Sequence, residues 1–345
     1  MKTVKIHFVG FWNDLDFENN LFTNILKKRY HIVLDSVDPD FVFCSVLGSP
    51  FEYMKYNCPR IMFTGEPMSV DFTAIDYFIG FDDIQFGDRA LRFPLFLMDM
   101  KGEGGVCEPL TEDEARKQLN EKDYFCNFIY GHQTISGIRE QMFETISKYK
   151  RVESIGRFMN NMPDGRTIVM YDKIPFMRKC KFSIACESMR YPGFVSEKIV
   201  HAFDANTIPV YYGDPDVGKT FNNESFLNLG RFADMESMMN KIIEIDRDDD
   251  LYIHMLCQCR YNEIEYEHKM YKLLEGFLYN IFDQDKEEAY RRPRWYYAAD
   301  YEKYLWHYND MQGTIPWRLD RKCRNLAWKW RKLIGAEERG GHLID

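Results

Sequence analysis

The chain has 345 residues, with 45 lysines and arginines against 54 aspartates and glutamates, which gives a formal net charge of −9. A chain of this length predicts two domains, each large enough to bury its own core. Hydrophobic residues make up 45% and charged residues 29%, a globular composition that excludes a disordered or fibrous protein. The acidic excess argues against a nucleic-acid partner.

The cysteines and the N-terminus indicate a cytoplasmic protein. Nine cysteines are spread along the chain without C-x-x-C pairs, which is typical of reduced thiols. Lys5 and His7 interrupt the first apolar run, so we expect a strand there and not a signal peptide. No run of about 18 apolar residues is present, so we expect no membrane-spanning helix.

Strand-like and helix-like segments alternate along the first hundred residues, which predicts a parallel sheet covered by helices on both faces. The expected elements are a strand at 4–11, a helix at 15–28, and strands at 41–46, 60–64 and 77–80. The glycine-rich run Gly102–Gly105 and the acidic run Thr111–Glu121 predict the connection between domains.

The same alternation resumes after this connection. The expected elements are strands at 125–130, 181–186 and 208–212, and helices at 138–148 and 195–203. We therefore predict two doubly wound α/β domains, residues 1–110 and 122–283. Such domains bind ligands outside the carboxyl ends of their strands, in the cleft between them.

The segment from Glu187 to Val200 holds the strongest chemical signal. A strand ends near Glu187, a Pro-Gly loop follows, and Ser196 stands where a helix N-cap belongs. Lys198 then places a cation in the first helical turn, where the helix dipole disfavours it. A bound phosphate would resolve this conflict. The alternative is that Lys198 pairs with a nearby carboxylate on a solvated face.

A second carboxylate, Glu66, follows the short apolar strand at 60–64. We expect it at the carboxyl end of that strand, where open α/β sheets place their ligands. There it can act as a general base facing the Lys198 loop. In the other interpretation, Gly65-Glu66-Pro67 is an ordinary polar turn.

Four segments together resemble one family of enzymes. They are Thr64–Glu66, the pair Asp76–Asp82 and Asp88–Leu95, the helix around Arg139, and Gly193–Asp214. On these segments the sequence resembles the α-1,3-fucosyltransferases of glycosyltransferase family ten, especially the bacterial ones. The resemblance covers about residues 60 to 230, and Gly193–Asp214 is its most distinctive part.

The resemblance implies a fold and an activity. It implies an α/β GT-B fold of two Rossmann-like domains facing a central cleft, with a C-terminal helical tail. It also implies GDP-fucose as donor, inversion at the sugar carbon, and no obligatory metal, a divalent ion being at most stimulatory. The expected reaction moves L-fucose to the 3-hydroxyl of GlcNAc in a β-galactosyl-GlcNAc acceptor, as in Lewis-type glycans of lipopolysaccharide.

The resemblance also assigns roles to individual residues. Glu66 matches the general base, and Arg139 matches a basic residue that contacts the donor pyrophosphate. Glu197 and Lys198 match the Glu-Lys pair that holds the donor. The donor-binding positions implied by the resemblance are Arg139, Glu187, Phe194, Glu197 and Lys198. Two departures concern the loop between Glu187 and Ser196, called the donor loop here. Phe194 replaces a donor-contacting tyrosine, and Ser188 replaces the asparagine after Glu187.

Alternatives to this interpretation involve metals and other functions. Asp38-Pro39-Asp40 and Asp214-Pro215-Asp216 match the D-x-D pattern of metal-dependent glycosyltransferases, but both lie in proline-containing turns, and we interpret them as turn residues. The same fold could serve another acceptor linkage or another nucleotide sugar. A catalytically silent sugar- or nucleotide-binding protein is the alternative outside the enzymes.

The C-terminal part divides into two segments. Residues 284–312 are rich in aromatic and charged residues, and we expect them to pack back on the N-terminal domain. Residues 315–345 form a basic tail in which Trp317–Leu333 carries one apolar stripe. Such a helix can lie on an anionic membrane surface, here the inner face of the cytoplasmic membrane. Docking on its own domain, or on a second copy in a homo-oligomer, is the alternative.

Overall fold

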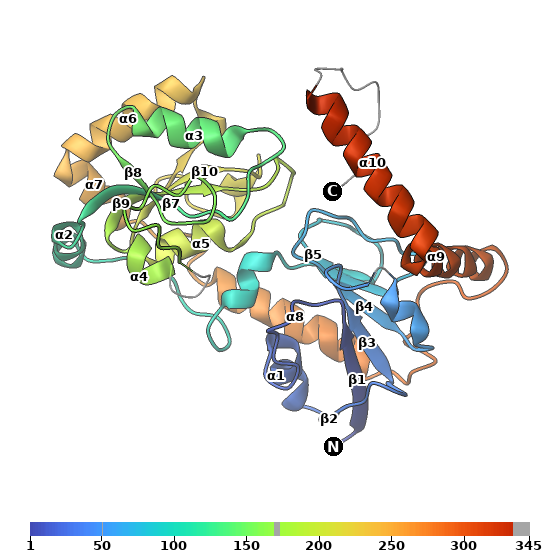
Figure 1. Ribbon diagram of the computed structural model, residues 1–345. Coiled ribbons are helices and arrows are strands. Elements are labelled where there is room, and N and C mark those ends of the chain that lie inside the picture. The colour runs from blue at the N-terminus through green and yellow to red at the C-terminus, as the bar shows by residue number, and fades with distance from the viewer. Residues whose placement is uncertain (50, 169–172, 334–345) are drawn as a thin grey trace.

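The computed structural model describes residues 1–49, 51–168 and 173–333. Two parallel sheets form the frame of the molecule (Figure 1). The N-terminal sheet has the strand order β2-β1-β3-β4-β5-β6. Its strands are β1 (Thr3–Val9), β2 (His31–Leu34), β3 (Phe41–Cys44), β4 (Arg60–Phe63), β5 (Tyr77–Gly80) and β6 (Ala90–Arg92).

The C-terminal sheet is also built from parallel pairs, in the order β11-β10-β9-β7-β8. Its strands are β7 (Tyr124–Phe128), β8 (Val152–Ser154), β9 (Cys180–Cys186), β10 (Ile208–Tyr212) and β11 (Leu227–Asn228). Every residue of β3, β4 and β5 is buried, as expected for strands covered on both faces. The predicted pair of doubly wound sheets is confirmed.

Helices cover both sheets. In the N-terminal half these are α1 (Leu21–Lys27) and, from much later in the chain, α8 (Tyr266–Phe282). The helices of the C-terminal half are α2 (Glu112–Asn120), α3 (Ile138–Ser147), α4 (Lys173–Met177), α5 (Glu197–Asp204), α6 (Met235–Arg247) and α7 (Asp249–Leu256). Much of the acidic run 111–121, predicted to be part of the connection, is therefore helix α2, which packs on α7.

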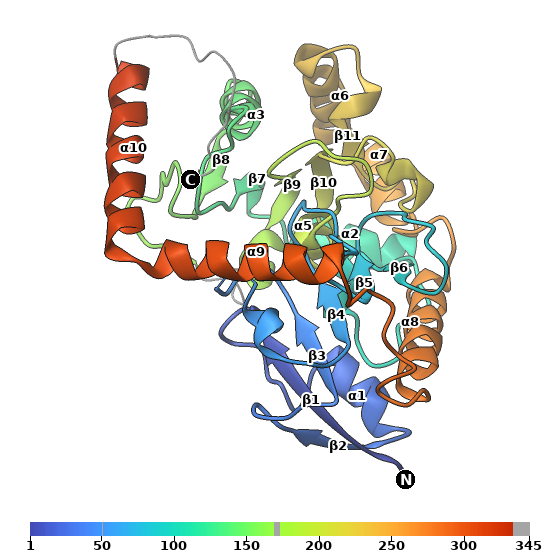
Figure 2. The same cartoon turned by 90° about the vertical axis from the view of Figure 1, so that its right-hand side faces the viewer.

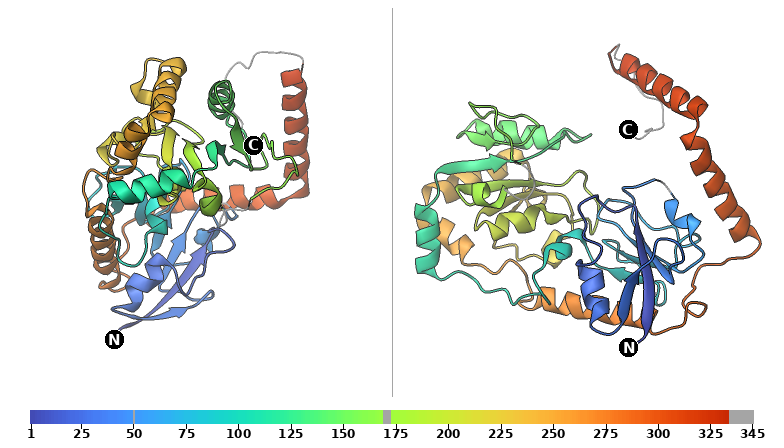
Figure 3. Two further views of the ribbon diagram at one scale, coloured as in Figure 1. Left: turned by 90° about the vertical axis from the view of Figure 1, so that its left-hand side faces the viewer. Right: turned by 60° about the horizontal axis from the view of Figure 1, so that its bottom comes forward.

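Helix α8 crosses from the C-terminal half to the N-terminal sheet, as Figure 3 shows along the lower side of the molecule. The Phe282 ring packs against Phe41 with 4.4 Å between centroids, and the Tyr279 hydroxyl donates to the carbonyl of Ile25 (3.3 Å). Leu274 and Leu278 are fully buried in the same core. The domain predicted as 122–283 thus contains a helix that packs on the other sheet.

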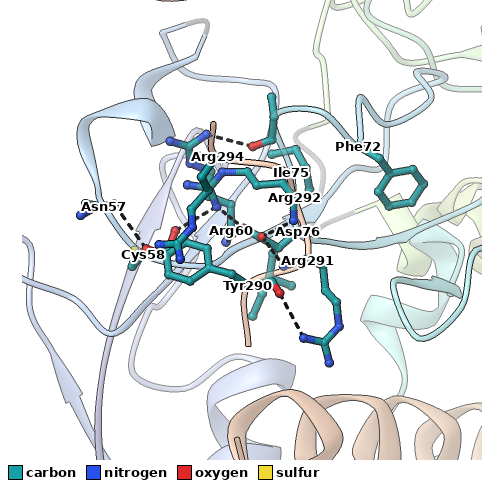
Figure 4. A network of polar contacts seen from close by, with 12 residues as sticks. Asn57, Cys58, Arg60, Phe72, Ile75, Asp76, Tyr290, Arg291, Arg292 and Arg294 are labelled. Atoms are coloured by element: carbon teal, nitrogen blue, oxygen red, sulfur yellow. Dashed lines mark hydrogen bonds and ion pairs between the residues drawn. The ribbon is translucent and has the colours of Figure 1, made fainter. Parts of the chain in front are cut away.

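The segment after α8 is fixed to the N-terminal domain by buried charges (Figure 4). The carboxylate of Asp76 is fully buried and accepts the backbone N–H groups of Arg60, Arg291 and Arg292. The Arg292 side chain forms ion pairs with Asp76 and with Glu302 of α9 (Tyr297–Gly313), and Arg60 also binds Glu302. Residues 290–302 therefore pack back on the N-terminal domain.

Helices α9 and α10 (Ile315–Leu333) form an arm that turns sharply between them (Figure 2). Leu319, Leu326 and Trp330 on α10 are exposed, so the described part of the apolar stripe is not docked on its own domain. Residues 334–345 of the predicted basic tail lie outside the described residues. Within the described residues, no helix is both long enough and apolar enough to cross a bilayer.

Candidate active site

The site is centred on Glu187, at the carboxyl end of β9. This side chain is fully buried. Its two oxygens accept the backbone N–H of Ser196 (2.9 Å) and the Ser196 hydroxyl (2.7 Å). The Lys198 ammonium donates to the same hydroxyl (2.8 Å) and lies 3.4 Å from Glu187. Glu187 therefore ties the end of a strand to the start of α5.

Lys198 is held between two carboxylates. Its Nζ lies 3.4 Å from Glu187 and 3.6 Å from Glu197. Burial lowers the pKa of Lys198, but the charges of Glu187 and Glu197 outweigh burial and leave the pKa above its usual value. The pairing considered as an alternative is thus present, although on a largely buried group and not on a solvated face.

Glu197 faces further cations. Lys173, at the start of α4, lies 3.8 Å from its carboxylate. Burial raises the pKa of Glu197, but Lys198, Lys173 and His201 outweigh it and lower the pKa to about 2. Burial also lowers the pKa of Lys173 below its usual value. Glu197 is therefore anionic at every pH near neutrality.

Arg139 lies beside this cluster, in the first turn of α3. Its Nε and Nη2 donate to the carbonyl of Cys186 (3.3 and 3.2 Å), and Nη1 donates to the carbonyl of His132 (3.1 Å). The guanidinium stacks over the Tyr130 ring at 4.2 Å. A guanidinium has five N–H donors, so these contacts with described residues leave two for an anionic ligand.

The first turns of two helices thus meet at the carboxyl end of β9, one carrying Arg139 and the other Lys198. Ser196 holds the N-cap position of α5 as predicted, but its hydroxyl binds Glu187 and caps no backbone N–H. The described side chains of this group carry three positive charges, on Arg139, Lys173 and Lys198. The two glutamates, Glu187 and Glu197, carry two negative charges, so the group has a net charge of +1. Helix N-termini and excess positive charge favour a phosphate group.

The loop before α5 touches the N-terminal domain. Gly193 has a φ of +81°, and a Cβ there would lie 2.8 Å from the carbonyl of Phe81, so glycine is required. Phe194 is buried, with its ring edge-on to Phe81 at 5.5 Å. Phe81 directly follows β5. The predicted donor contact Phe194 therefore lies where the two domains meet.

Glu66 lies in the loop after β4, as predicted, and is exposed. Its backbone N–H donates to the Thr64 hydroxyl (3.0 Å). Because β4 and β5 are parallel neighbours, Glu66 and Phe81 leave the sheet at the same edge, the edge that meets the donor loop. Among the described residues no hydrogen bond or ion pair joins Glu66 to Arg139 or Lys198.

Two residues of the cluster, Lys173 and His201, were not predicted. His201 lies one turn after Glu197 on α5, and its Nε2 is 3.1 Å from Asp99 of the N-terminal domain. The helical spacing from Glu197 could have indicated His201. Lys173 lies in a short helix ahead of β9, and nothing in its local sequence marks it.

The D-x-D segments are turn residues, as interpreted from the sequence. The Asp214 carboxylate accepts the backbone N–H groups of Gly193 and Asp216 (both 2.8 Å), and burial raises its pKa. Asp40 accepts the backbone N–H of Lys5 (2.8 Å). In the part of the chain that is described, no three His, Cys, Asp or Glu side chains are grouped to hold a metal ion.

Two family models match this chain. Residues 6–99 match the N-terminal domain of the alpha-(1,3)-fucosyltransferase FucT, and residues 119–273 match the C-terminal part of glycosyltransferase family 10 (fucosyltransferase). The chain belongs to glycosyltransferase family 10. The resemblance found on the sequence motifs is therefore confirmed.

Two relatives named as fucosyltransferases agree with this assignment. The alpha-(1,3)-fucosyltransferase FucT of Helicobacter pylori is 26% identical over 82% of this chain and 66% of its own length. A protein of Acanthamoeba polyphaga mimivirus named as a fucosyltransferase is 27% identical over 64% of this chain and 36% of its own length. This chain thus spans at most about two thirds of these relatives.

Solved structures of alpha1,3-fucosyltransferases share the architecture. A crystal structure of an alpha1,3-fucosyltransferase has a TM-score of 0.66 and 25% identity, covering 82% of this chain and 91% of the other. A second crystal structure of an alpha1,3-fucosyltransferase, with GDP, has a TM-score of 0.66 and 24% identity, over 85% and 93%. The expected GT-B fold is confirmed.

Proposed function

We propose that this chain is an inverting α-1,3-fucosyltransferase that moves L-fucose from GDP-fucose to the 3-hydroxyl of GlcNAc in a β-galactosyl-GlcNAc acceptor. The observation that carries the proposal is the meeting of Arg139, Glu187 and Lys198 at the carboxyl end of β9 in a family 10 chain. This group has the excess positive charge and the two helix N-termini that favour a nucleoside diphosphate.

The chemistry follows from where the charges lie. An acceptor hydroxyl is a poor nucleophile at neutral pH, so a carboxylate that takes its proton while the new bond forms lowers the barrier. Glu66 has this role in the proposal. The departing GDP gains negative charge on its β-phosphate, and Arg139 and Lys198 stabilise that charge. A single displacement at the sugar carbon, through an oxocarbenium-like state, gives inversion.

Direct product analysis tests this function. Incubation with GDP-fucose and a small acceptor panel, with the product linkage determined by NMR, should give an α-1,3-linked fucose on GlcNAc. A different linkage, or transfer from another nucleotide sugar only, would overturn the assigned acceptor or donor. GDP binding without transfer to any acceptor would instead favour the silent binding protein.

Glu66→Gln separates catalysis from donor binding. We expect at least about a hundredfold loss of kcat, because an amide cannot accept the proton, while GDP affinity stays unchanged. Steady-state kinetics and calorimetry measure the two quantities. Glu52→Gln, a change to a surface carboxylate of the same domain, is the control. Near-normal kcat in Glu66→Gln would remove Glu66 from its role.

We further propose that α10 holds the protein on an anionic membrane surface, the inner face of the cytoplasmic membrane. Exposed Leu319, Leu326 and Trp330 on a helix rich in arginine and lysine support this proposal. Flotation with vesicles containing anionic lipid should recover the full chain but not a chain truncated at Trp317. Equal recovery of both chains would overturn it, and self-association of the full chain alone would favour a homo-oligomer.

A further inference from the structure

Four tyrosines form a row along α9, defined here as the tyrosine row. Its members are Tyr297, Tyr301, Tyr304 and Tyr308. At about 100° per residue these four positions fall within about 60° of one another on the helix. Leu305, which is buried, points to the adjacent side, toward the N-terminal domain. The tyrosine row thus follows the edge of the contact between α9 and that domain.

Two of the four rings are largely exposed, Tyr297 at 92% and Tyr304 at 64%. Tyr301 is 39% exposed, and Tyr308, which packs on Trp317, is half-buried. Single exposed aromatic residues are ordinary, but several large rings on one helix face indicate a binding surface. Lys303 is the only lysine or arginine of α9, and it points to the opposite side of the helix from the tyrosine row. The row therefore lacks the positive charge that lipid phosphates or nucleic acids require.

The row is connected to the loop of the proposed base. The Tyr301 hydroxyl donates to the carboxylate of Asp71 (2.8 Å), which lies in the same β4–β5 loop as Glu66. Met68, between them in this loop, is 46% exposed. Tyr304 and Tyr308 follow Tyr301 along α9, which leads to α10 (Figure 2). At that end Tyr308 packs on Trp317, with 5.6 Å between the ring centroids. A ligand extending from the Glu66 loop along the arm meets these rings.

We propose that the tyrosine row binds the acceptor glycan beyond the sugar that receives fucose, so that the enzyme prefers extended glycans. This inference rests on the proposed fucosyltransferase function. The C–H face of a sugar ring packs on an aromatic face, and tyrosine adds a hydroxyl for hydrogen bonds at a low entropy cost. The row spans about 16 Å at 1.5 Å per residue, enough to contact several sugar rings.

The acceptor-length dependence of the rate tests this inference. We expect kcat/KM for a trimer of β-galactosyl-GlcNAc to exceed that for the disaccharide by about tenfold, and the double variant Tyr297→Ala/Tyr304→Ala to lose this preference through a higher KM for the trimer. Trp306→Ala removes an exposed aromatic ring from another side of α9 and should retain the preference. Equal kcat/KM for the two acceptors in wild type, or a retained preference in the double variant, would overturn the inference.

A binding measurement separates this inference from the proposed activity. Saturation-transfer NMR with the trimer alone should show contact with tyrosine rings in wild type and a weaker signal in the double variant. This result would support the row as a glycan site even if fucose transfer to every acceptor failed. A change of oligomeric state in the double variant, seen by sedimentation, would overturn the inference and make the row a self-interface.

Discussion

Lys198 lies where burial, two carboxylates and the start of a helix act on one ammonium group. Glu187 and Glu197 hold the charge in place and keep the pKa of Lys198 above its usual value. A cation whose position is fixed in advance loses little conformational entropy when it binds a phosphate. The pairing and the phosphate interpretations of Lys198 are therefore compatible, because the first prepares the second.

Removal of Lys198 tests this role. We expect Lys198→Ala to bind GDP at least about tenfold more weakly, because a charge-assisted contact is lost and two carboxylates lose their shared cation. Calorimetry with GDP measures the affinity. Lys179→Ala removes a lysine of the same domain that is 56% exposed, and it should bind GDP like wild type. Equal affinity in both variants would refute the role of Lys198.

Glu197 makes stability depend on pH in acid. Its pKa is lowered from 4.5 to about 2 in the folded chain, where the nearby cations outweigh burial. A carboxyl group with a lowered pKa stabilises the fold above its unfolded pKa and loses that contribution as the pH falls through the folded pKa. We expect the difference in unfolding free energy between wild type and Glu197→Gln to shrink between about pH 4.5 and pH 2. Urea titrations measure it, and a difference constant over this range would contradict the prediction.

The residues that sequence reasoning found share a local signal. Glu66 and Glu187 follow apolar strands, and Lys198 opens a helix, so their positions at the strand ends could be predicted. Lys173 contributes through a contact with Glu197, and His201 through a contact with Asp99 as well as its helical spacing from Glu197. The contacts Lys173–Glu197 and His201–Asp99 join segments distant in sequence and leave no local pattern, so only the spacing of His201 could have been used.

At the scale of single elements, α2 is a helix in a run that was predicted from its charge to be part of the connection between domains. The run 111–121 looked like a connection because it is acidic and buries only Ala115. Its charges instead stabilise a helix, since Thr111 and Glu114 form a capping box and three acidic residues lie in the first turn. Strands of two or three residues, such as β8 and β11, were missed because they are too short to show a period.

The attachment of α9 depends on Asp76. We expect Asp76→Asn to lower the free energy of unfolding by about 3 kcal/mol, because the buried guanidinium of Arg292 loses the fully buried one of its two ion-pair partners and keeps only Glu302. Urea denaturation measures this loss, and limited proteolysis should show faster cleavage within residues 285–300. Asp285→Asn changes an exposed carboxylate, 87% accessible, and should alter stability by less than about 0.5 kcal/mol. Equal stability of the two variants would show that the network does not fix α9.

At the scale of the whole molecule, the N-terminal domain is discontinuous in sequence. Its core needs Leu274, Leu278 and Phe282 of α8, which follow the whole C-terminal sheet. The spacing of apolar residues in α8 predicts a helix with one apolar face. Such a face can pack on either sheet, so the sequence does not indicate which sheet α8 covers. The two sheets could therefore be predicted, while the crossing of α8 could not.

Two truncated chains test this dependence. A chain ending at Glu265 lacks α8, and we expect its N-terminal half to lose cooperative unfolding, because an apolar face of the sheet is left in water. A chain ending at Gly313 keeps α8 and α9 but lacks residues 314–345, and it should unfold like the full chain. Urea unfolding followed by near-ultraviolet circular dichroism distinguishes them. Equal protection of residues 1–100 from proteolysis in both chains would contradict the dependence on α8.

The crossing of α8 also sets an order of events during translation. Strands β1 to β6 leave the ribosome first, yet the helix that closes their core is made only after the whole C-terminal sheet. The later half is contiguous and can mature early, while the earlier half waits with apolar surface uncovered. Chaperones should therefore bind mainly to the strands that were synthesised first. Slow translation before α8 should prolong this binding.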